Sequence, residues 1–404
     1  MTRRALLGAL LLIALPLGAG RAQVPELRAY YLNVWVGSDQ GPFTDAALSG
    51  FQRFRLMTAP VYGRFAFDVA YEQTLTWRSD STAGILAPDA GQNASSGDWL
   101  NLQGTIAESQ RVVWRQRVDR LSVAYMGDAF DVTLGRQPIS WATTMYLTPA
   151  DPFQPFDPAD PFRVYRFGVD AFRVQLFPGP MTELEVVVRP SETVEDDVIT
   201  ALARARTSLG SWDLETWAGV VFDEPAVSAA ATVTVAGAAV RGEAVLQWTA
   251  DGSRYEDPVL RFALGVDRSF NVFSRSLYLL AEYQRDGFGA ANSEELIPVA
   301  LSVPYGRGQM QVLGRDEVVA LASYEVDPLW TTQFLVIWNI NDPSALLTPA
   351  ISYSASEETT VQVGAFFGVG ANTSDITVPG VGPLPGSEYG PVPATGYVSV
   401  TIFF

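Results

Sequence analysis

The sequence contains neither cysteine nor histidine in 404 residues. Without cysteine the chain cannot form a disulfide, a thiolate nucleophile or a cysteine-based zinc site. Without histidine it cannot build a Ser-His-Asp triad or a histidine-ligated metal centre. Any catalysis would have to use carboxylates, tyrosine or serine alone. The remaining residues show no ligand spacing that predicts a metal site or a cofactor.

Charged residues are also scarce, at 18%, against roughly 25% in soluble domains. Beyond residue 22 no run of 18 apolar residues occurs, so the sequence predicts no membrane-spanning helix. Yet hydrophobic residues make up 48% and aromatic residues 12% of the chain. Acidic residues outnumber basic ones by 44 to 27, which argues against a nucleic-acid partner because such a partner needs a basic surface.

The first 22 residues resemble a secretory signal peptide. Arg3 and Arg4 precede an apolar run over residues 5–19, and residues 20–22 form a small-x-small cleavage site. A retained membrane anchor is the alternative. Cleavage would remove three of the 27 basic residues, leaving 24 against 44 acidic residues and a net charge of −20 on residues 23–404, which we expect to form one domain.

Alternation between apolar and polar residues recurs along the rest of the chain. In residues 62–77 one face carries Phe65, Phe67 and Val69, and the opposite face carries Arg64 and Asp68. Such long alternation is typical of membrane β-strands, and a closed barrel is the only membrane-spanning fold besides helices. Short and long connections alternate, which predicts an all-β, antiparallel, up-and-down transmembrane barrel of about 18 strands. Sixteen is the alternative, because the alanine-rich stretch 228–240 is a weak strand.

The last residues alternate in the same way. Val398, Val400, Ile402 and Phe404 share one face of the final strand. This segment resembles the terminal strand of bacterial outer-membrane barrels, which ends in an aromatic residue. The resemblance implies an outer-membrane location, with membrane lipid and the barrel-assembly machinery as partners.

If the apolar faces meet lipid, the opposite faces line the interior. The interior is then polar and mixed in sign, and its charges either contact a solute or form salt bridges that stiffen the wall. The inward-facing candidates are Arg53, Arg55, Arg64, Asp68, Glu72, Arg120, Asp131, Arg173, Arg204 and Arg206. Arg115, Arg117 and Asp119 break the pattern. Either a bulge near residues 118–120 turns them inward, or this stretch stands above the membrane.

Residues 137–166 form a long connection with proline at every third position from 149 to 161. That spacing favours a stiff polyproline II segment. Its aromatic residues need burial, and we expect the segment to fold into the barrel as a constriction; a rigid external cap is the alternative. The constriction candidates are Trp141, Phe153, Phe156, Asp157 and Phe162.

Residues 135–173, which include Gly-Arg-Gln137, the proline repeat and Gly-Val-Asp-Ala-Phe-Arg173, resemble a segment of porin-like bacterial barrels, including the branch related to alginate exporters. The resemblance implies a channel with arginines near a constriction made by a loop. It adds Arg136 and Arg166 to the pore candidates.

The sequence therefore predicts a porin-like channel for passive diffusion of small hydrophilic solutes, because barrels of 16–18 strands enclose an aqueous channel. Two alternatives stay open: a substrate-specific or polysaccharide-export channel, and a structural or adhesive barrel with a closed lumen. An enzyme of the barrel type is not expected, since such enzymes use histidine. The oligomeric state is left open.

Overall fold

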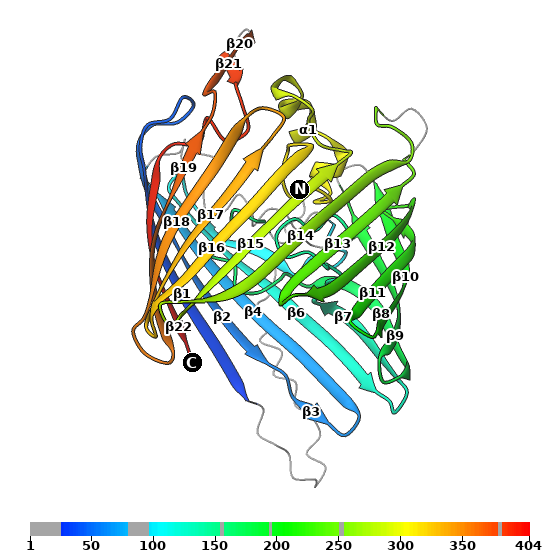
Figure 1. Ribbon diagram of the computed structural model, residues 1–404. Coiled ribbons are helices and arrows are strands. Elements are labelled where there is room, and N and C mark those ends of the chain that lie inside the picture. Colours follow the sequence, from blue (N-terminus) through cyan, green and yellow to red (C-terminus); the bar gives the residue numbers. More distant parts are fainter. Residues whose placement is uncertain (1–25, 80–96, 154–156, 194–195, 250–253, 379–381) are drawn as a thin grey trace, which may run out of the picture.

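β-Strands cover most of the computed structural model (Figure 1). The structure describes residues 26–79, 97–153, 157–193, 196–249, 254–378 and 382–404, so the predicted signal peptide lies outside the described residues. The first eleven strands are β1 (Leu27–Ser38), β2 (Ala47–Thr58), β3 (Val61–Tyr62), β4 (Phe65–Arg78), β5 (Gln103–Glu108), β6 (Val112–Met126), β7 (Phe130–Gln137), β8 (Val169–Gly179), β9 (Thr182–Glu192), β10 (Asp197–Leu209) and β11 (Trp212–Val221). The others are β12 (Glu224–Val235), β13 (Ala238–Gln247), β14 (Val259–Val272), β15 (Arg275–Asp286), β16 (Asp316–Asp327), β17 (Trp330–Asn339), β18 (Ser344–Ser354), β19 (Thr359–Val369), β20 (Thr373–Val378), β21 (Gly382–Pro385) and β22 (Thr395–Phe403).

Eighteen of these strands form a closed antiparallel ring, as the sequence predicts. Successive strands pair with one another, and β22 closes the ring by pairing with both β1 and β19. The alanine-rich stretch 228–240 forms paired parts of β12 and β13, which removes the sixteen-strand alternative. The other four strands lie outside the count: β3 pairs with the start of β4, β5 pairs with β6 beyond the end of β7, and β20 and β21 form a separate hairpin.

Short turns join the strands at one end of the barrel and longer segments join most of them at the other (Figure 1). We call these the turn end and the loop end. Both termini of the ring lie at the turn end, where Ala29 and Phe404 exchange two backbone hydrogen bonds. The loop end carries the β20–β21 hairpin and a short helical segment made of η1 (Ser293–Glu295), α1 (Leu296–Ala300) and α2 (Val303–Gly306). None of the helices in the described ranges is long and apolar enough to span a membrane.

The outer face of the barrel is apolar. Side chains predicted to point outward are exposed, including Phe65 (49%), Leu134 (58%) and Leu264 (55%). On the last strand Val398 is exposed as well, with Val400 and Ile402 on the same face, and Phe404 follows the strand. Because the ring is closed and each of its strands pairs with a neighbour on both sides, this surface can face hydrocarbon without an open sheet edge.

A β-bulge in β6 reverses the orientation of the charged stretch 115–119, whose side chains would otherwise lie on the lipid-facing side of the strand. Ala70 of β4 faces Arg120, whereas the next residue, Tyr71, faces Val118, so Asp119 is the extra residue. The bulge turns Arg117 and Asp119 inward, where they are buried at 7% and 0% exposure. A charge facing lipid costs about 2–4 kcal/mol at mid-membrane. The predicted bulge is therefore confirmed.

Candidate functional site in the barrel interior

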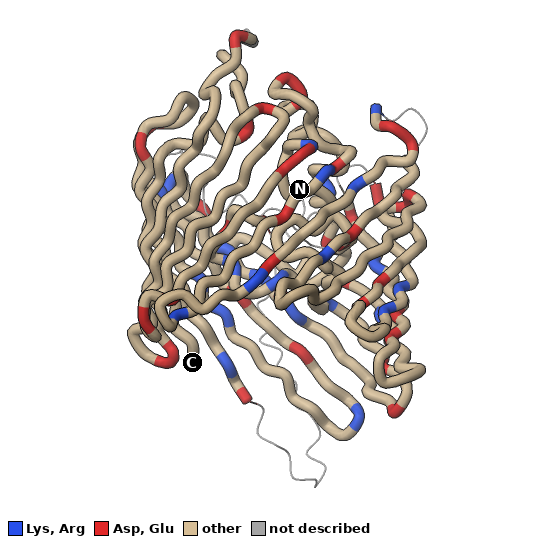
Figure 2. The backbone as a smooth tube through the Cα atoms, in the orientation of Figure 1, with Lys and Arg blue, Asp and Glu red and all other residues tan. Residues whose placement is uncertain are grey.

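Arginines on the inner face of the early strands are tied to carboxylates. The chain has no lysine, so all 27 basic residues carry the planar guanidinium that pairs with a carboxylate through two nitrogens. Figure 2 shows that charged positions gather along β8–β11 and are sparse along β17–β19. The ion pairs in this half of the interior are Arg53–Glu72 (3.7 Å), Arg55–Glu72 (3.2 Å), Arg55–Asp119 (2.5 Å), Arg120–Asp119 (3.3 Å), Arg120–Asp68 (3.9 Å), Arg173–Glu185 (2.5 Å), Arg204–Glu185 (2.7 Å) and Arg204–Glu215 (2.8 Å).

The predicted pore residues differ in how exposed their side chains are and in whether a carboxylate pairs with them. Arg55 and Arg136 face the interior but are buried at 2% and 0% exposure, so neither side chain reaches an open passage. Arg173 keeps a partly exposed side chain, at 21%. Arg206 is exposed, and within the described residues no ion pair joins it to a carboxylate. Asp131 faces inward and is half-buried on β7.

Arg64 lies apart from the other arginines. It follows Gly63 in the tight turn before β4 and pairs with Asp128 in the neighbouring turn, at 3.0 Å. Both side chains are exposed at the turn end of the barrel, at 53% and 89%. Arg64 is therefore placed at the rim and not among the buried ion pairs.

Arg136 is the centre of a buried cluster that the sequence did not reveal. Its guanidinium pairs with Asp170 at 2.7 Å and Asp98 at 3.2 Å, and donates to the Leu100 carbonyl at 2.6 Å. Asp98 also pairs with Arg117, at 3.2 Å. Burial raises the pKa of the Asp98 carboxyl, while Arg117 and Arg136 oppose that shift. The cluster joins residues 97–102 to the barrel wall. The spacing of these residues in the sequence does not predict this contact.

The segment between β7 and β8 crosses the interior. Its buried residues Trp141 and Phe153 pack with side chains of β9–β13, while Leu147 packs with side chains of β1 and β15–β18 on the other side. Two inward-facing glutamates hold the middle of the segment through its backbone. Glu243 accepts N–H bonds from residues 143, 144 and 150 at 2.7–3.0 Å, and Glu282 accepts those of residues 145, 146 and 147 at 2.7–3.0 Å.

The aromatic candidates anchor this segment at both sides. The Trp141 ring lies 4.9 Å from Phe153 and 6.5 Å from Trp217, whose indole N–H donates to the Ala150 carbonyl at 3.0 Å. The Phe162 ring lies 5.7 Å from Phe51 and 4.8 Å from Tyr397. Phe156 lies outside the described residues.

The proline repeat forms turns and not a polyproline II helix. In Asp-Pro-x the carboxylate of Asp157 accepts the N–H of Ala159, and that of Asp160 accepts the N–H of Phe162, each at 2.8 Å. Proline has no N–H, so the residue after it is the first donor the aspartate can reach. The expected continuous helix is therefore wrong for the described residues, 149–153 and 157–162.

Arg166 and a glycine fix the end of the segment. The Arg166 guanidinium pairs with Asp151, whose pKa is raised by burial and lowered in part by that arginine. Gly168 lies against the bulge in β6, where a Cβ would approach the Asp119 carbonyl oxygen to 2.3 Å. Its N–H donates to the Asp119 carboxylate at 3.2 Å. Only glycine allows this close contact between the segment and the wall.

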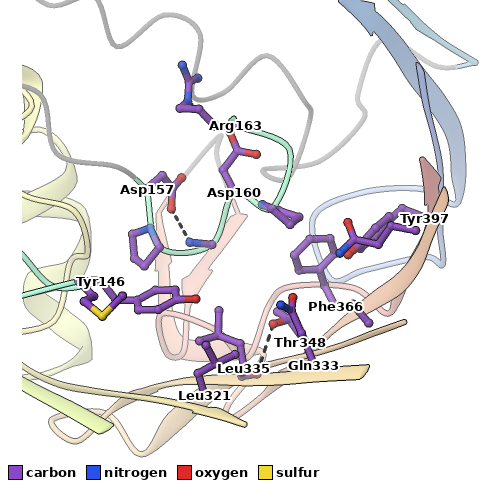
Figure 3. A pocket seen from close by; sticks show the side chains of 16 residues that line it. Tyr146, Asp157, Asp160, Arg163, Leu321, Gln333, Leu335, Thr348, Phe366 and Tyr397 are labelled. Atoms are coloured by element: carbon purple, nitrogen blue, oxygen red, sulfur yellow. Dashed lines mark hydrogen bonds and ion pairs between the residues drawn. The ribbon is translucent and has the colours of Figure 1, made fainter. Parts of the chain in front are cut away.

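A cavity of about 340 Å³ remains between the segment and the wall (Figure 3). On the segment side it is lined by Tyr146 and residues 157–163, and on the opposite side by side chains of β16–β19 and β22. Asp157 is exposed here. The segment thus narrows the interior without filling it.

This architecture is the barrel fold of outer-membrane porins. Solved structures with the same fold include Acinetobacter baumannii OccAB1, at 11% identity and a TM-score of 0.58, covering 96% of this chain and 98% of that one. Escherichia coli Wzi, a carbohydrate-binding barrel involved in capsule assembly, shares 9% identity with a TM-score of 0.54, covering 94% of this chain and 84% of that one. Pseudomonas aeruginosa OccK2 (OpdF), solved with glucuronate, shares 9% with a TM-score of 0.53, covering 94% and 98%. No protein-family model and no curated sequence matches the chain.

Proposed function

We propose that this protein is an outer-membrane channel through which small hydrophilic solutes diffuse passively. The observation that carries the proposal is the closed ring of eighteen strands whose interior is polar on one side and crossed by a fixed segment. Side chains alone do not fill a ring of that size. The segment leaves a cavity beside it, which sets an upper limit on solute size.

The paired charges support diffusion of many solutes over capture of one anion. Most inward-facing arginines are already bound to carboxylates, so they offer few free donors to an anionic substrate. An anionic polymer would also face the acidic surplus of the chain. The export alternative is weakened for that reason.

A structural barrel with a closed lumen is the second candidate. It is favoured by the two apolar clusters through which the crossing segment packs against opposite walls. Wzi, whose fold is similar, is described as a carbohydrate-binding barrel, and binding need not involve transport. The two functions differ in one property, the passage of solute.

For location and partners we propose export through residues 1–22, insertion into outer-membrane lipid, and recognition of the final strand by the barrel-assembly machinery. The support is the apolar outer belt and the alternation of Val398, Val400 and Ile402 beside Phe404. The acidic composition supports the absence of a nucleic-acid partner.

Solute entry into proteoliposomes tests the proposal. Vesicles containing the refolded mature chain should admit a small uncharged pentose far faster than a trisaccharide, and empty vesicles should admit neither. Vesicles with folded protein that exclude every solute would favour the closed barrel.

A further inference from the structure

The cavity beside the crossing segment has one wall without charge. Strands β17, β18, β19 and β22 contain no acidic or basic residue at any position. The side chains that these strands present to the cavity include Gln333, Leu335, Thr348, Ala350 and Gln362, and Leu321 of the neighbouring β16 adds a further apolar one (Figure 3 labels four of the six). A charged solute pressed against this wall would lose hydration and find no opposite charge there.

Two amides on this wall are available for hydrogen bonding. In the described part of the chain no hydrogen bond joins the side chain of Gln333 or Gln362 to another residue. Both lie on inward-facing positions, on β17 and β19. Each amide offers a carbonyl acceptor and two N–H donors. Thr348 adds a hydroxyl that donates to the Leu335 carbonyl at 3.3 Å and can accept a bond in return.

Apolar surfaces alternate with these polar groups. The rings of Phe366 and Tyr397, 5.5 Å apart, lie beside Leu335 in the cavity lining. Both rings are nine-tenths or more buried, at 4% exposure. The cavity lining thus places apolar side chains next to these amides, which suits a molecule whose ring faces carry C–H groups and whose edges carry hydroxyls.

The segment side of the cavity is preformed and slightly acidic. The turns at Asp157 and Asp160 hold their carboxylates in place. Asp160 pairs with Arg163 at 3.5 Å, so the two nearly cancel, and Asp157 supplies an exposed carboxylate. That carboxylate can accept two neighbouring hydroxyls and would repel an anion.

We propose that this cavity is a selectivity site for uncharged polyhydroxy solutes of about monosaccharide size. The inference rests on the proposed channel function and names the solute class that passes best. Anions are disfavoured by Asp157, since the charge of Asp160 is balanced by Arg163, and cations find no carboxylate on the wall opposite. A hydroxyl donates and accepts, so it satisfies both the amides and the carboxylate without carrying charge into the cavity.

Three hexoses with the same ring test the selectivity. Uptake of radiolabelled glucose, glucosamine and glucuronate at millimolar concentration is compared in the same proteoliposomes. Glucose should enter severalfold faster than both charged analogues. Faster uptake of glucuronate or of glucosamine than of glucose would overturn the proposal.

Substitution of the amides tests the site itself. The double variant Gln333→Leu/Gln362→Leu keeps the side-chain volume and removes the hydrogen bonds, and should lower glucose uptake by about threefold to tenfold. Gln175→Leu is the matched control, because Gln175 faces the interior on β8, outside the cavity lining. It should leave glucose uptake unchanged.

Folding is checked by the heat-dependent gel mobility of the barrel, and Thr348→Val provides a second, milder variant whose expected loss is about twofold. Unchanged glucose uptake in a folded double variant would refute the site. Ion conductance with no preference among the hexoses would refute the selectivity and leave the channel standing. Failure of all solutes and ions to pass would refute the channel as well.

Discussion

At the scale of single residues, burial separates the arginines that stabilise the barrel from those that solutes can reach. Arg136 has no exposed surface and pairs with both Asp98 and Asp170. Arg64 makes a similar pair with Asp128, but in water at the turn end. An arginine–aspartate pair therefore affects the free energy of unfolding much more in the buried cluster than at the exposed turn end.

Replacing Arg136 should destabilise the protein without changing ion selectivity. Arg136→Met leaves the buried carboxylate of Asp170 without its ion-pair partner and Asp98 with Arg117 alone, which costs about 3–5 kcal/mol in the free energy of unfolding. Urea unfolding followed by tryptophan fluorescence measures this loss. Arg64→Met is the control and should leave the free energy of unfolding essentially unchanged. A stable Arg136→Met protein with altered ion selectivity would place Arg136 on the pore surface instead.

Glu282 offers a second prediction at this scale, because it accepts three backbone N–H groups of the crossing segment. Glu282→Gln replaces the charged acceptor by a neutral one, which weakens the three bonds together by about 1.4 kcal/mol or more and should raise the detached population of the segment at least tenfold. Single-channel recording should then show increased current noise. Glu325→Gln, an exposed glutamate near the turn end, should record like the parent protein; equal noise in both variants would contradict the anchoring role.

At the scale of elements, the crossing segment is the part of the barrel that sets the width of the channel we propose. It packs against β9–β13 on one side and against β1 and β15–β18 on the other. Deleting residues 149–161 removes the turns that line the cavity while the ring keeps its strand pairing. The deletion should raise single-channel conductance severalfold. Conductance that stays the same would mean that ions bypass the segment.

The elements differ in how far the sequence predicts them. Strand faces follow from alternation, which is a local property of neighbouring residues, whereas alternation left open both the strand number, eighteen or sixteen, and the bulge at Asp119, which the strand register decides. The anchoring of the crossing segment cannot be predicted in this way, because Glu243 and Glu282 lie about a hundred residues or more further along the sequence than the backbone N–H groups that they bind. The burial of Arg136 depends on Asp98, which belongs to a different loop. The prediction of a polyproline II helix failed because it considered only the spacing of the prolines. The aspartate before a proline accepts the N–H of the residue after it, which forms a turn.

At the scale of the whole molecule, the sign of the electrostatic potential inside the barrel depends on which charged side chains are held in ion pairs. The inward-facing arginines Arg55, Arg120 and Arg204 are each paired with carboxylates, and the chain as a whole has 44 acidic residues against 27 basic ones. An acidic surplus around a low-dielectric passage concentrates cations. Under a potassium chloride gradient the reversal potential should therefore show a preference for potassium, weakening at high salt. A chloride preference would mean that exposed Arg206 and Arg173 dominate.

The most direct test of the account is single-channel recording of the refolded mature protein in a planar bilayer. An open, narrowed barrel predicts discrete current steps of uniform size that grow in proportion to voltage. A protein that inserts as a folded barrel yet produces no steps would contradict the channel, and the crossing segment would then be a plug.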